Sequence, residues 1–385
     1  MRVPRVTGVS ARPRVVVLRG HQANPWELRP WTLLADRFDV VVPRPVRGDG
    51  FDTGTLPLER VEARTLRDVL PKGRVGDLLA RVPGDRYLRL EDVLRGADVV
   101  HTQELGYWYS AQAARLKDRL GYRLVANVWE TLPFAGAYRN VRTRPYREAV
   151  LRHTDLFLPA TERARDALLV EGADASRLQI CAPGVDTSRF RPAGPTATGD
   201  PVVLSAGRLV WEKGHQDLLR AVALLARRGA TVLPRIVIVG KGPDEGRLRT
   251  YADELGLTER TEFRSFVPYG DMPATYAEAS ALWLGSMPVW SWEEQFGMVL
   301  AEAHAAGLPI VTTTSGAIPE VAGPTATFVA PGDWVGLADA LSARVLAPAS
   351  TGPHEVRDAE RVREFSIEAA AGRLGAAYDR VLGAS

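Results

Sequence analysis

The sequence predicts an α/β protein built from two parallel-sheet domains. Short β-branched runs alternate with helical patterns along the whole chain of 385 residues. A stretch rich in proline, glycine and small polar residues, 182–201, lies near the middle and is typical of an interdomain linker. The chain is 25% charged and 45% hydrophobic, which excludes a disordered chain and a disulfide-stapled miniprotein.

The expected strands divide evenly between two halves. Those of the first half are Arg14–Leu18, Asp39–Val42, Asp98–His101, Arg123–Val128, Leu156–Leu158 and Leu178–Cys181. Those of the second half are Val202–Ala206, Arg235–Val239, Glu262–Phe266, Ala281–Leu284, Ile310–Thr313 and Thr327–Val329. Each half has about the strand count of one Rossmann-like domain. We therefore expect an N-terminal domain over 1–190, a C-terminal domain over 191–365 and a closing helix over 366–385.

The net charge of +3 hides an asymmetry between these halves. Residues 1–190 carry 31 Lys and Arg against 23 Asp and Glu, a net charge of +8, whereas the remainder carries 18 against 23, a net charge of −5. The arginines are scattered and form no basic stripe interleaved with aromatic residues, so nucleic acid is the weakest explanation. An anionic acceptor or an anionic membrane surface fits the basic half as well.

The chain also suggests its compartment. Its one cysteine, Cys181, cannot form an internal disulfide, and no stretch of about 18 apolar residues could span a bilayer. The basic N-terminus has no apolar run before its first strand, so it does not resemble a secretory signal. We expect a cytoplasmic protein, either free or peripheral at the inner face of the membrane.

The segment Trp290–Gly307 is the richest in potential chemistry. A helix should open at Phe296 or Gly297 and stop at Gly307, with Glu294 in the loop before it and Glu302 about two turns inside. The free amides of the first turn favour an anion such as a pyrophosphate, and the two carboxylates could hold sugar hydroxyls. The alternative is that Glu302 belongs to a solvated helix face.

A second candidate site is Ser205–Gly214, which directly follows an expected strand. Arg208 and Lys213 could converge at the carboxyl edge of the sheet and stabilise a diphosphate leaving group. The alternative is two surface cations. The chain has 45 arginines and only four lysines, Lys72, Lys117, Lys213 and Lys241, so a retained lysine in a glycine-flanked turn favours a functional role.

Two common nucleotide motifs are absent. The turn Val239–Gly242 would need glycine at position 245 to complete a dinucleotide fingerprint, and this chain has Glu245 there. The sequence also lacks GxxxxGK[ST]. Hydride chemistry and P-loop NTP hydrolysis therefore lose their main support.

Five segments together resemble retaining glycosyltransferases of family 4, which have the GT-B fold of two facing Rossmann-like domains. They are PGVDTSRFRP, GRLVWEKG, IVGKGPDEGRLR, the Glu-x7-Glu motif from Glu294 to Glu302, and SGAIPEV, in this order. The resemblance covers nearly the whole chain. It implies a hexosyltransferase that uses a nucleotide-diphosphate sugar and a C-terminal helix that crosses back to the N-terminal domain.

The resemblance also implies roles for particular residues. Arg208, Lys213 and Glu294 would be catalytic, with the two cations on the donor diphosphate and Glu294 on the hydroxyls of the transferred sugar. Glu302 would bind the ribose, and Gly20 would lie near the diphosphate from the N-terminal side. The backbone amides of Phe296, Gly297, Met298 and Val299 would complete the donor site. The family needs no metal, and we expect no cofactor.

The N-terminal half departs from the family pattern. Many relatives carry a histidine after the strand Arg123–Val128, where this chain has Trp129 and Glu130, and the DVVHxH pattern keeps His101 but has Gln103 in place of the second histidine. We take His101, Glu104, Trp129 and Glu130 as acceptor-side candidates, each of which could instead be structural.

The resemblance favours a front-face retaining transfer, although Glu130 remains an alternative nucleophile. A UDP-sugar is the first choice of donor, with GDP-, ADP- and dTDP-sugars open. The acceptor could be a glycan, a lipid or a natural product. A basic cluster of Arg139, Arg142, Arg144 and Arg147 could contact an anionic acceptor or headgroup, or form a solvated helix face. Alternative functions are a GT-B epimerase, a sugar phosphorylase and a non-catalytic sugar-binding protein.

Overall fold

The computed structural model describes residues 12–46, 56–71, 73, 86–135, 143–190, 200–346 and 358–383. In this part of the chain two six-stranded parallel sheets are found, in the orders β3-β2-β1-β4-β5-β6 and β12-β11-β10-β7-β8-β9. The strands of the first sheet are β1 Arg14–Val17, β2 Asp39–Arg44, β3 Glu59–Glu62, β4 Val99–Gln103, β5 Arg123–Val128 and β6 Leu156–Pro159. Those of the second are β7 Val202–Ala206, β8 Arg235–Val239, β9 Thr261–Arg264, β10 Ala281–Leu284, β11 Ile310–Thr313 and β12 Thr327–Val329.

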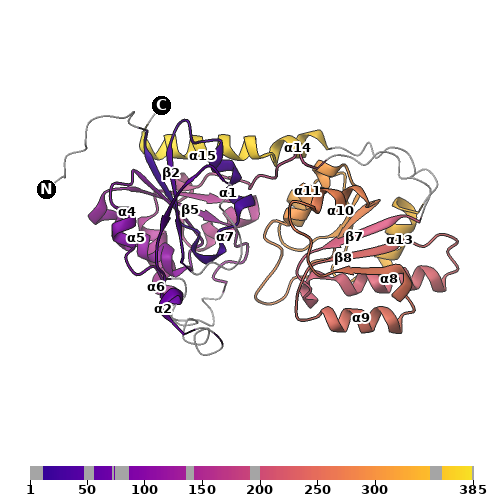
Figure 1. Ribbon diagram of the computed structural model, residues 1–385. Helices are drawn as coiled ribbons and strands as arrows, with labels where there is room; N and C mark the ends of the chain where they lie inside the picture. The colour runs from indigo at the N-terminus through magenta and orange to yellow at the C-terminus, as the bar shows by residue number, and fades with distance from the viewer. Residues whose placement is uncertain are drawn as a thin grey trace.

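Helices cover both sheets (Figure 1). Around the first sheet they are α1 Pro25–Thr32, α2 Leu66–Val69, α4 Leu90–Leu94, α5 Trp108–Leu120, α6 Arg144–His153 and α7 Glu162–Val170, with the 3₁₀ turns η1 Gly20–Gln22 and η3 Ala175–Arg177. In the second half they are α8 His215–Arg227, α9 Glu245–Glu254, α10 Met272–Ala277, α11 Met298–Ala306, α12 Ile318–Ala322, α13 Trp334–Arg344, α14 Ala359–Glu364 and α15 Ile367–Leu382, with η4 Trp211–Lys213 and η5 Thr258–Arg260.

Both faces of each sheet are buried, which explains the apolar runs in the sequence. In β1, Val15 and Val17 pack into one core cluster, whereas Val16 and the following Leu18 pack into the other. Successive side chains of a strand point to opposite faces, so a strand covered on both sides must be apolar throughout.

The two sheets share one topology that places ligand sites. In each, the first strand lies between the second and the fourth, so the order reverses between β1 and β4 and between β7 and β10. Open α/β sheets bind ligands at the carboxyl ends of the strands beside such a reversal. The segments that follow β1, β4, β7 and β10 are therefore where this fold predicts a site.

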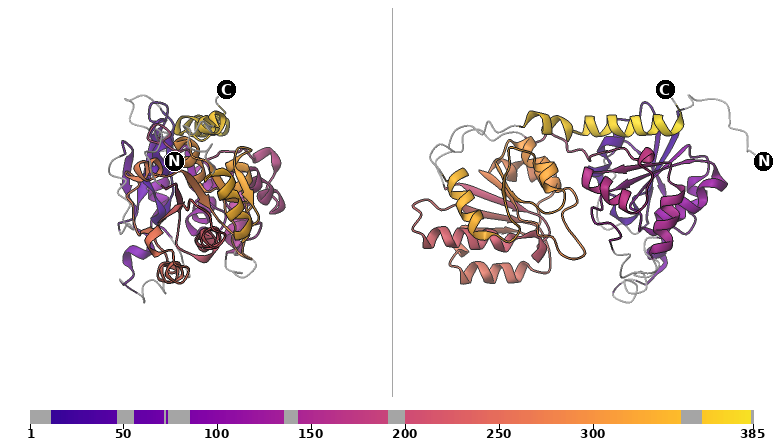
Figure 2. Two further views of the ribbon diagram at one scale, coloured as in Figure 1. Left: turned by 90° about the vertical axis from the view of Figure 1, so that its right-hand side faces the viewer. Right: turned by 180° about the vertical axis from the view of Figure 1, so that it is seen from behind.

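The C-terminal helix α15 lies against the N-terminal sheet domain. Figure 1 and the right-hand view of Figure 2, which are seen from opposite sides, both show α15 running along that domain. The α15 residues Ala371, Leu374 and Tyr378 belong to the core cluster that contains Val15 and Val17 of β1. The Trp31 indole N–H donates to the Tyr378 hydroxyl at 2.7 Å. Ser366 caps the helix by accepting a hydrogen bond from the Ala369 amide.

Residues from the two halves also contact one another. The Arg163 guanidinium binds the Glu293 carboxylate through two N–O contacts of 2.5 and 2.9 Å. The Glu320 carboxylate accepts from the Glu162 amide at the start of α7 at 2.7 Å, and the rings of Trp26 and Tyr269 lie 4.5 Å apart. These contacts bring the carboxyl edges of both sheets toward a shared region.

The strand predictions were right except in two places. Leu178–Cys181 forms an isolated bridge from Leu178 to Phe157 rather than a strand. The strand β3 was missed because its sequence, ERVE, is charged and its residues are exposed or half-buried at the sheet edge, which leaves no apolar pattern to detect. The closing helix predicted within 366–385 is found as α15, Ile367–Leu382.

Candidate active site

Lys213 and Glu294 form the centre of the C-terminal site. The Lys213 ammonium donates to a Glu294 carboxylate oxygen at 2.6 Å, and both side chains are largely buried. The ammonium also lies 4.6 Å from the centre of the Trp292 ring. Lys213 follows β7 and Glu294 follows β10, and these neighbouring strands are the ones between which the strand order reverses. The fold therefore brings into contact two side chains that are 81 positions apart in the sequence.

A close backbone contact holds the Lys213 turn in place. Gly214 has a φ of 70°, and a Cβ there would lie 2.0 Å from the carbonyl oxygen of Gly285, just after β10. No other residue type fits so close an approach in the left-handed region. The Trp283 indole donates to the Gly214 carbonyl at 3.2 Å. The glycine after Lys213 is therefore required by packing against the neighbouring strand end.

Glu294 is fixed from two further directions. The Ser286 hydroxyl donates to the same carboxylate oxygen that Lys213 binds. The Ala317 amide donates to the Glu294 carbonyl at 2.9 Å, and a Cβ at Gly316 would lie only 2.1 Å from that carbonyl oxygen. The SGAIPEV motif thus acts as a backbone support for Glu294.

Glu302 is a buried carboxyl and does not belong to a solvated helix face, so that alternative was wrong. Only 3% of the residue is exposed. The Tyr276 hydroxyl donates to its carboxylate at 2.6 Å. Burial raises the pKa of Glu302 to about 7, and hydrogen bonds from Tyr276 and Tyr269 partly oppose that rise.

The helix α11 begins at Met298, one or two residues later than predicted. Among the residues that the structure describes, none accepts a hydrogen bond from the backbone amides of Gly297, Met298 or Val299. The Phe296 side chain is in the core, against Phe365 and Trp129. The start of α11 therefore presents free amides, as an anion site requires.

Arg208 and Gly20 lie at the carboxyl ends of β7 and β1. The Arg208 side chain is exposed, and within the described ranges it makes no hydrogen bond or ion pair. Gly20 opens the turn η1 directly after β1. Their predicted contacts with the donor remain predictions.

A pocket of about 300 Å³ lies on the N-terminal side. Glu104, Trp129 and Glu130, which follow β4 and β5, line it together with Gln295 from the loop that carries Glu294. The Trp129 amide donates to Glu104 at 2.8 Å, and the Gln295 side-chain amide donates to Glu130 at 3.3 Å. Three of the four acceptor-side candidates therefore line one pocket. The pocket reaches Gln295, which directly follows Glu294 in the chain.

Two carboxyls of this pocket, Glu104 and Glu130, have raised pKa values. Burial, helped by the neighbouring Glu130 carboxylate, raises the pKa of Glu104 to about 7, although a hydrogen bond from the Trp129 amide opposes the rise. Burial also raises the pKa of Glu130, although the amides of Leu132 and Thr131 oppose this by donating to its carboxylate.

His101 does not line the acceptor pocket and is corrected to a core residue. It is 0% exposed, and its Nδ1 lies 2.7 Å from the Tyr378 hydroxyl of α15. Burial lowers the pKa of His101 to about 3, so the ring is neutral. His101 is the third residue of β4, and its side chain lies between the sheet and α15. A sequence motif alone does not show which face of the strand a residue occupies.

The basic cluster is only partly described, since Arg139 and Arg142 lie outside the described residues. Arg144 is exposed and pairs with Glu148. Arg147, however, is 7% exposed and pairs with the buried Glu171 beside the acceptor pocket. Arg147 is thus not part of a solvated helix face. No described helix is long and apolar enough to cross a bilayer.

The structure adds partners that the sequence did not single out. Ser286 and Trp292 contact the Lys213–Glu294 pair, Tyr276 contacts Glu302, and Gln295 links the two halves. The EEQFG spacing could have suggested Gln295, because it directly follows Glu294. In the described part of the chain no group of three or more His, Cys, Asp or Glu side chains could hold a metal ion.

The fold and the paired sites define a GT-B glycosyltransferase. The models for "Glycosyltransferase Family 4" and "Glycosyl transferases group 1" match residues 33–189 and 186–349. A D-inositol 3-phosphate glycosyltransferase of Corynebacterium glutamicum is 30% identical over 73% of this chain and 72% of its own length. The chain belongs to family 4 of the glycosyltransferases.

Solved structures support the same fold. The HepE protein of Anabaena, crystallised with UDP and glucose, matches with a TM-score of 0.75 at 17% identity, covering 96% of this chain and 100% of that one. A sucrose-phosphate synthase from Thermosynechococcus elongatus matches with a TM-score of 0.78 at 19% identity, covering 97% of this chain and 100% of its own.

Proposed function

We propose that this glycosyltransferase takes its sugar from a nucleoside diphosphate sugar, with a UDP-sugar as the first choice. The Lys213–Glu294 pair carries the proposal, because it places a cation and a carboxylate side by side at the topological reversal. Relatives and neighbours named for glycosyl transfer, and one solved with UDP and glucose, support the same donor class.

The donor would meet positive charge from three sources. Arg208 has a free guanidinium, Lys213 is already held in place, and the start of α11 presents free amides. Positive groups fixed where phosphate charge develops lower the barrier to its departure. We infer that these groups take the role that a divalent metal has in other transferases, so transfer needs no metal.

The transfer would retain the anomeric configuration by a front-face route. The bond from the anomeric carbon to the diphosphate oxygen breaks, the acceptor oxygen bonds that carbon on the same face, and the departing phosphate oxygen takes the acceptor's proton. Glu130 fits a positioning role, because its two carboxylate oxygens accept from Thr131, Leu132 and Gln295.

The acceptor would enter the pocket lined by Glu104, Trp129 and Glu130. Carboxyl groups that bind hydroxyls suit a glycan, a glycolipid headgroup or a polyhydroxylated natural product. The relatives named as D-inositol 3-phosphate glycosyltransferases act on a polyhydroxylated ring, which supports that class.

The donor proposal is tested by thermal shift with UDP-, GDP-, ADP- and dTDP-sugars. A ligand at a hundred times its dissociation constant stabilises the folded state by about 2.7 kcal/mol, which raises the melting temperature measurably. Glu302→Gln should reduce the shift for the true donor. No shift with any of the four would contradict the donor class, and an unchanged shift in Glu302→Gln would contradict the ribose assignment alone.

Peripheral membrane binding through the basic N-terminal half is a separate part of the proposal. Sedimentation with anionic vesicles should show binding that falls as salt rises. Absence of salt-sensitive binding would contradict this membrane association.

A further inference from the structure

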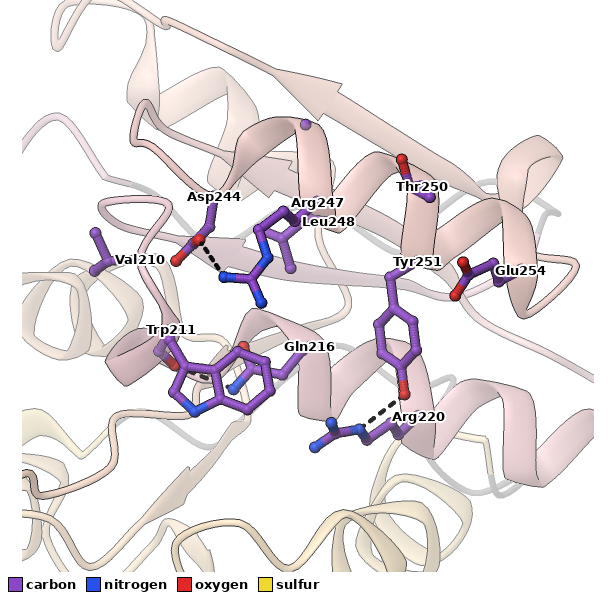
Figure 3. A pocket seen from close by; sticks show the side chains of 11 residues that line it. Val210, Trp211, Gln216, Arg220, Asp244, Arg247, Leu248, Thr250, Tyr251 and Glu254 are labelled. Carbon is purple, nitrogen blue, oxygen red and sulfur yellow. Dashed lines mark hydrogen bonds and ion pairs between the residues drawn. The ribbon is translucent and has the colours of Figure 1, made fainter.

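A second pocket, of about 430 Å³, lies in the C-terminal domain outside the candidate active site (Figure 3). It is formed between η4 and the helices α8 and α9. Its lining residues include Trp211, Gln216, Arg220, Asp244, Arg247 and Tyr251. None of these side chains has a role in the site described above.

One polar atom in this pocket lacks a partner. Gln216 is 1% exposed, and its side-chain N–H donates to the Trp211 carbonyl at 3.1 Å, which fixes the orientation of the amide. Its Oε1 is buried and accepts no hydrogen bond from any residue that the structure describes. A buried carbonyl oxygen without a donor costs free energy that a ligand hydroxyl would recover. The oxygen would repel an anion.

Two aromatic rings frame the same space. Trp211 is 47% exposed, which is unusual for so large an apolar side chain. Figure 3 shows Trp211 and Arg247 on one side of the pocket and Tyr251 on the other, with its ring extending toward Arg220. The Tyr251 hydroxyl is held by the Arg220 guanidinium at 2.9 Å, which leaves the ring in a fixed position.

The cations of the pocket are already paired. Arg220 binds Asp217 at 2.8 Å, and Arg247 binds Asp244 at 3.2 Å. Glu254 adds a further carboxylate to the lining. The described lining therefore carries no excess positive charge, and it disfavours a phosphate or a nucleotide.

We propose that this pocket binds a pyranose ring of a neutral carbohydrate, as a site separate from the donor and acceptor sites. A pyranose has apolar C–H faces and a rim of hydroxyl groups. The C–H face would stack on Trp211, a hydroxyl would donate to Gln216 Oε1, and Asp244, Arg247 and Glu254 would meet the remaining hydroxyls.

The two sites lie on opposite sides of one short turn. Trp211 and Lys213 both belong to η4, with Trp211 at the pocket and Lys213 on Glu294. A binding test must therefore keep the donor site filled, so that a sugar in the catalytic cleft is not mistaken for one in this pocket.

Saturation-transfer NMR on the UDP-saturated enzyme tests the proposal, with methyl α-glucoside, methyl α-mannoside, methyl α-galactoside and N-acetylglucosamine at millimolar concentration. At least one pyranoside should bind. Trp211→Ala should weaken that binding about tenfold, as expected from the loss of a stacked ring. Arg249→Ala, on the same helix as Arg247 but outside the lining, is the matched control and should bind as the wild type does.

Thr250→Arg provides a second variant, because Thr250 lines the pocket from an exposed helix position and its replacement fills the pocket with little effect on folding. It should also abolish binding. The proposal is overturned when no pyranoside binds, when binding survives in both Trp211→Ala and Thr250→Arg, or when Trp129→Ala removes it and these two variants do not.

Discussion

Lys213 and Glu294 lie 2.6 Å apart although 81 residues separate them, and the same carboxylate oxygen accepts from Ser286. The pair joins the strand ends that flank the reversal of the C-terminal sheet. An ammonium fixed in this way needs little rearrangement to meet a diphosphate, which is the condition for effective electrostatic stabilisation of a leaving group.

Replacing Lys213 with methionine should lower kcat by about 10²- to 10³-fold, because it removes a fixed positive charge from the leaving diphosphate. Steady-state transfer assays measure the effect, and the melting temperature confirms folding. Arg249→Ala removes a surface cation that pairs with Glu245, so it should leave kcat unchanged. A Lys213→Met enzyme with wild-type kcat would contradict the assignment.

Replacing Glu302 with glutamine should change how stability depends on pH. The pKa of Glu302 is raised from 4.5 to about 7 in the folded protein, so its contribution is fully present below pH 4.5 and is lost as pH rises through 7. Glutamine does not titrate, so the variant does not lose stability in this way. Its melting temperature should therefore rise relative to that of the wild type as pH increases from about 5 to about 8. A constant difference across this range would show that the carboxyl titrates normally.

The product should keep the anomeric configuration of the donor sugar, and proton NMR of the first product formed would show it. Glu130→Gln should retain measurable transfer, with kcat reduced by about 10-fold or less, because the amide can still accept from Thr131 and Leu132. An inverted product would contradict the mechanism. Complete loss of transfer with a trapped glycosyl-enzyme in wild type would instead identify Glu130 as a nucleophile.

Replacing Tyr378 with phenylalanine should destabilise the protein by about 1–3 kcal/mol, because its hydroxyl is the partner of both the Trp31 indole and His101. Denaturant unfolding measures the change. Since the contact lies in the core between β4 and α15, KM for the acceptor should stay at the wild-type value. A large change in KM with no loss of stability would return His101 to the list of acceptor-side residues.

Much of the fold could be predicted because it depends on local patterns. Apolar runs such as RVVV and RIVIV are typical of strands buried on both faces, and Gly307 with Pro309 predicts where α11 ends. The strand β3 could not be predicted, because an exposed strand at the edge of a sheet needs no apolar pattern. Leu178–Cys181 looked like a strand because it does run along β6, with the Gln179 and Cys181 amides donating to Phe157 and Pro159, but it forms only one bridge.

The sequence by itself determined the two α/β halves, the family and the motifs that carry Arg208, Lys213, Glu294 and Glu302. Only the tertiary structure decided which of these side chains meet. Spacing along the chain cannot place Lys213 on Glu294, bury Glu302 beneath Tyr276, or put His101 in the core beneath α15, because each contact depends on the order of the strands. Burial then raises the pKa of Glu302 and lowers that of His101, because the removal of water disfavours the charged form of each side chain.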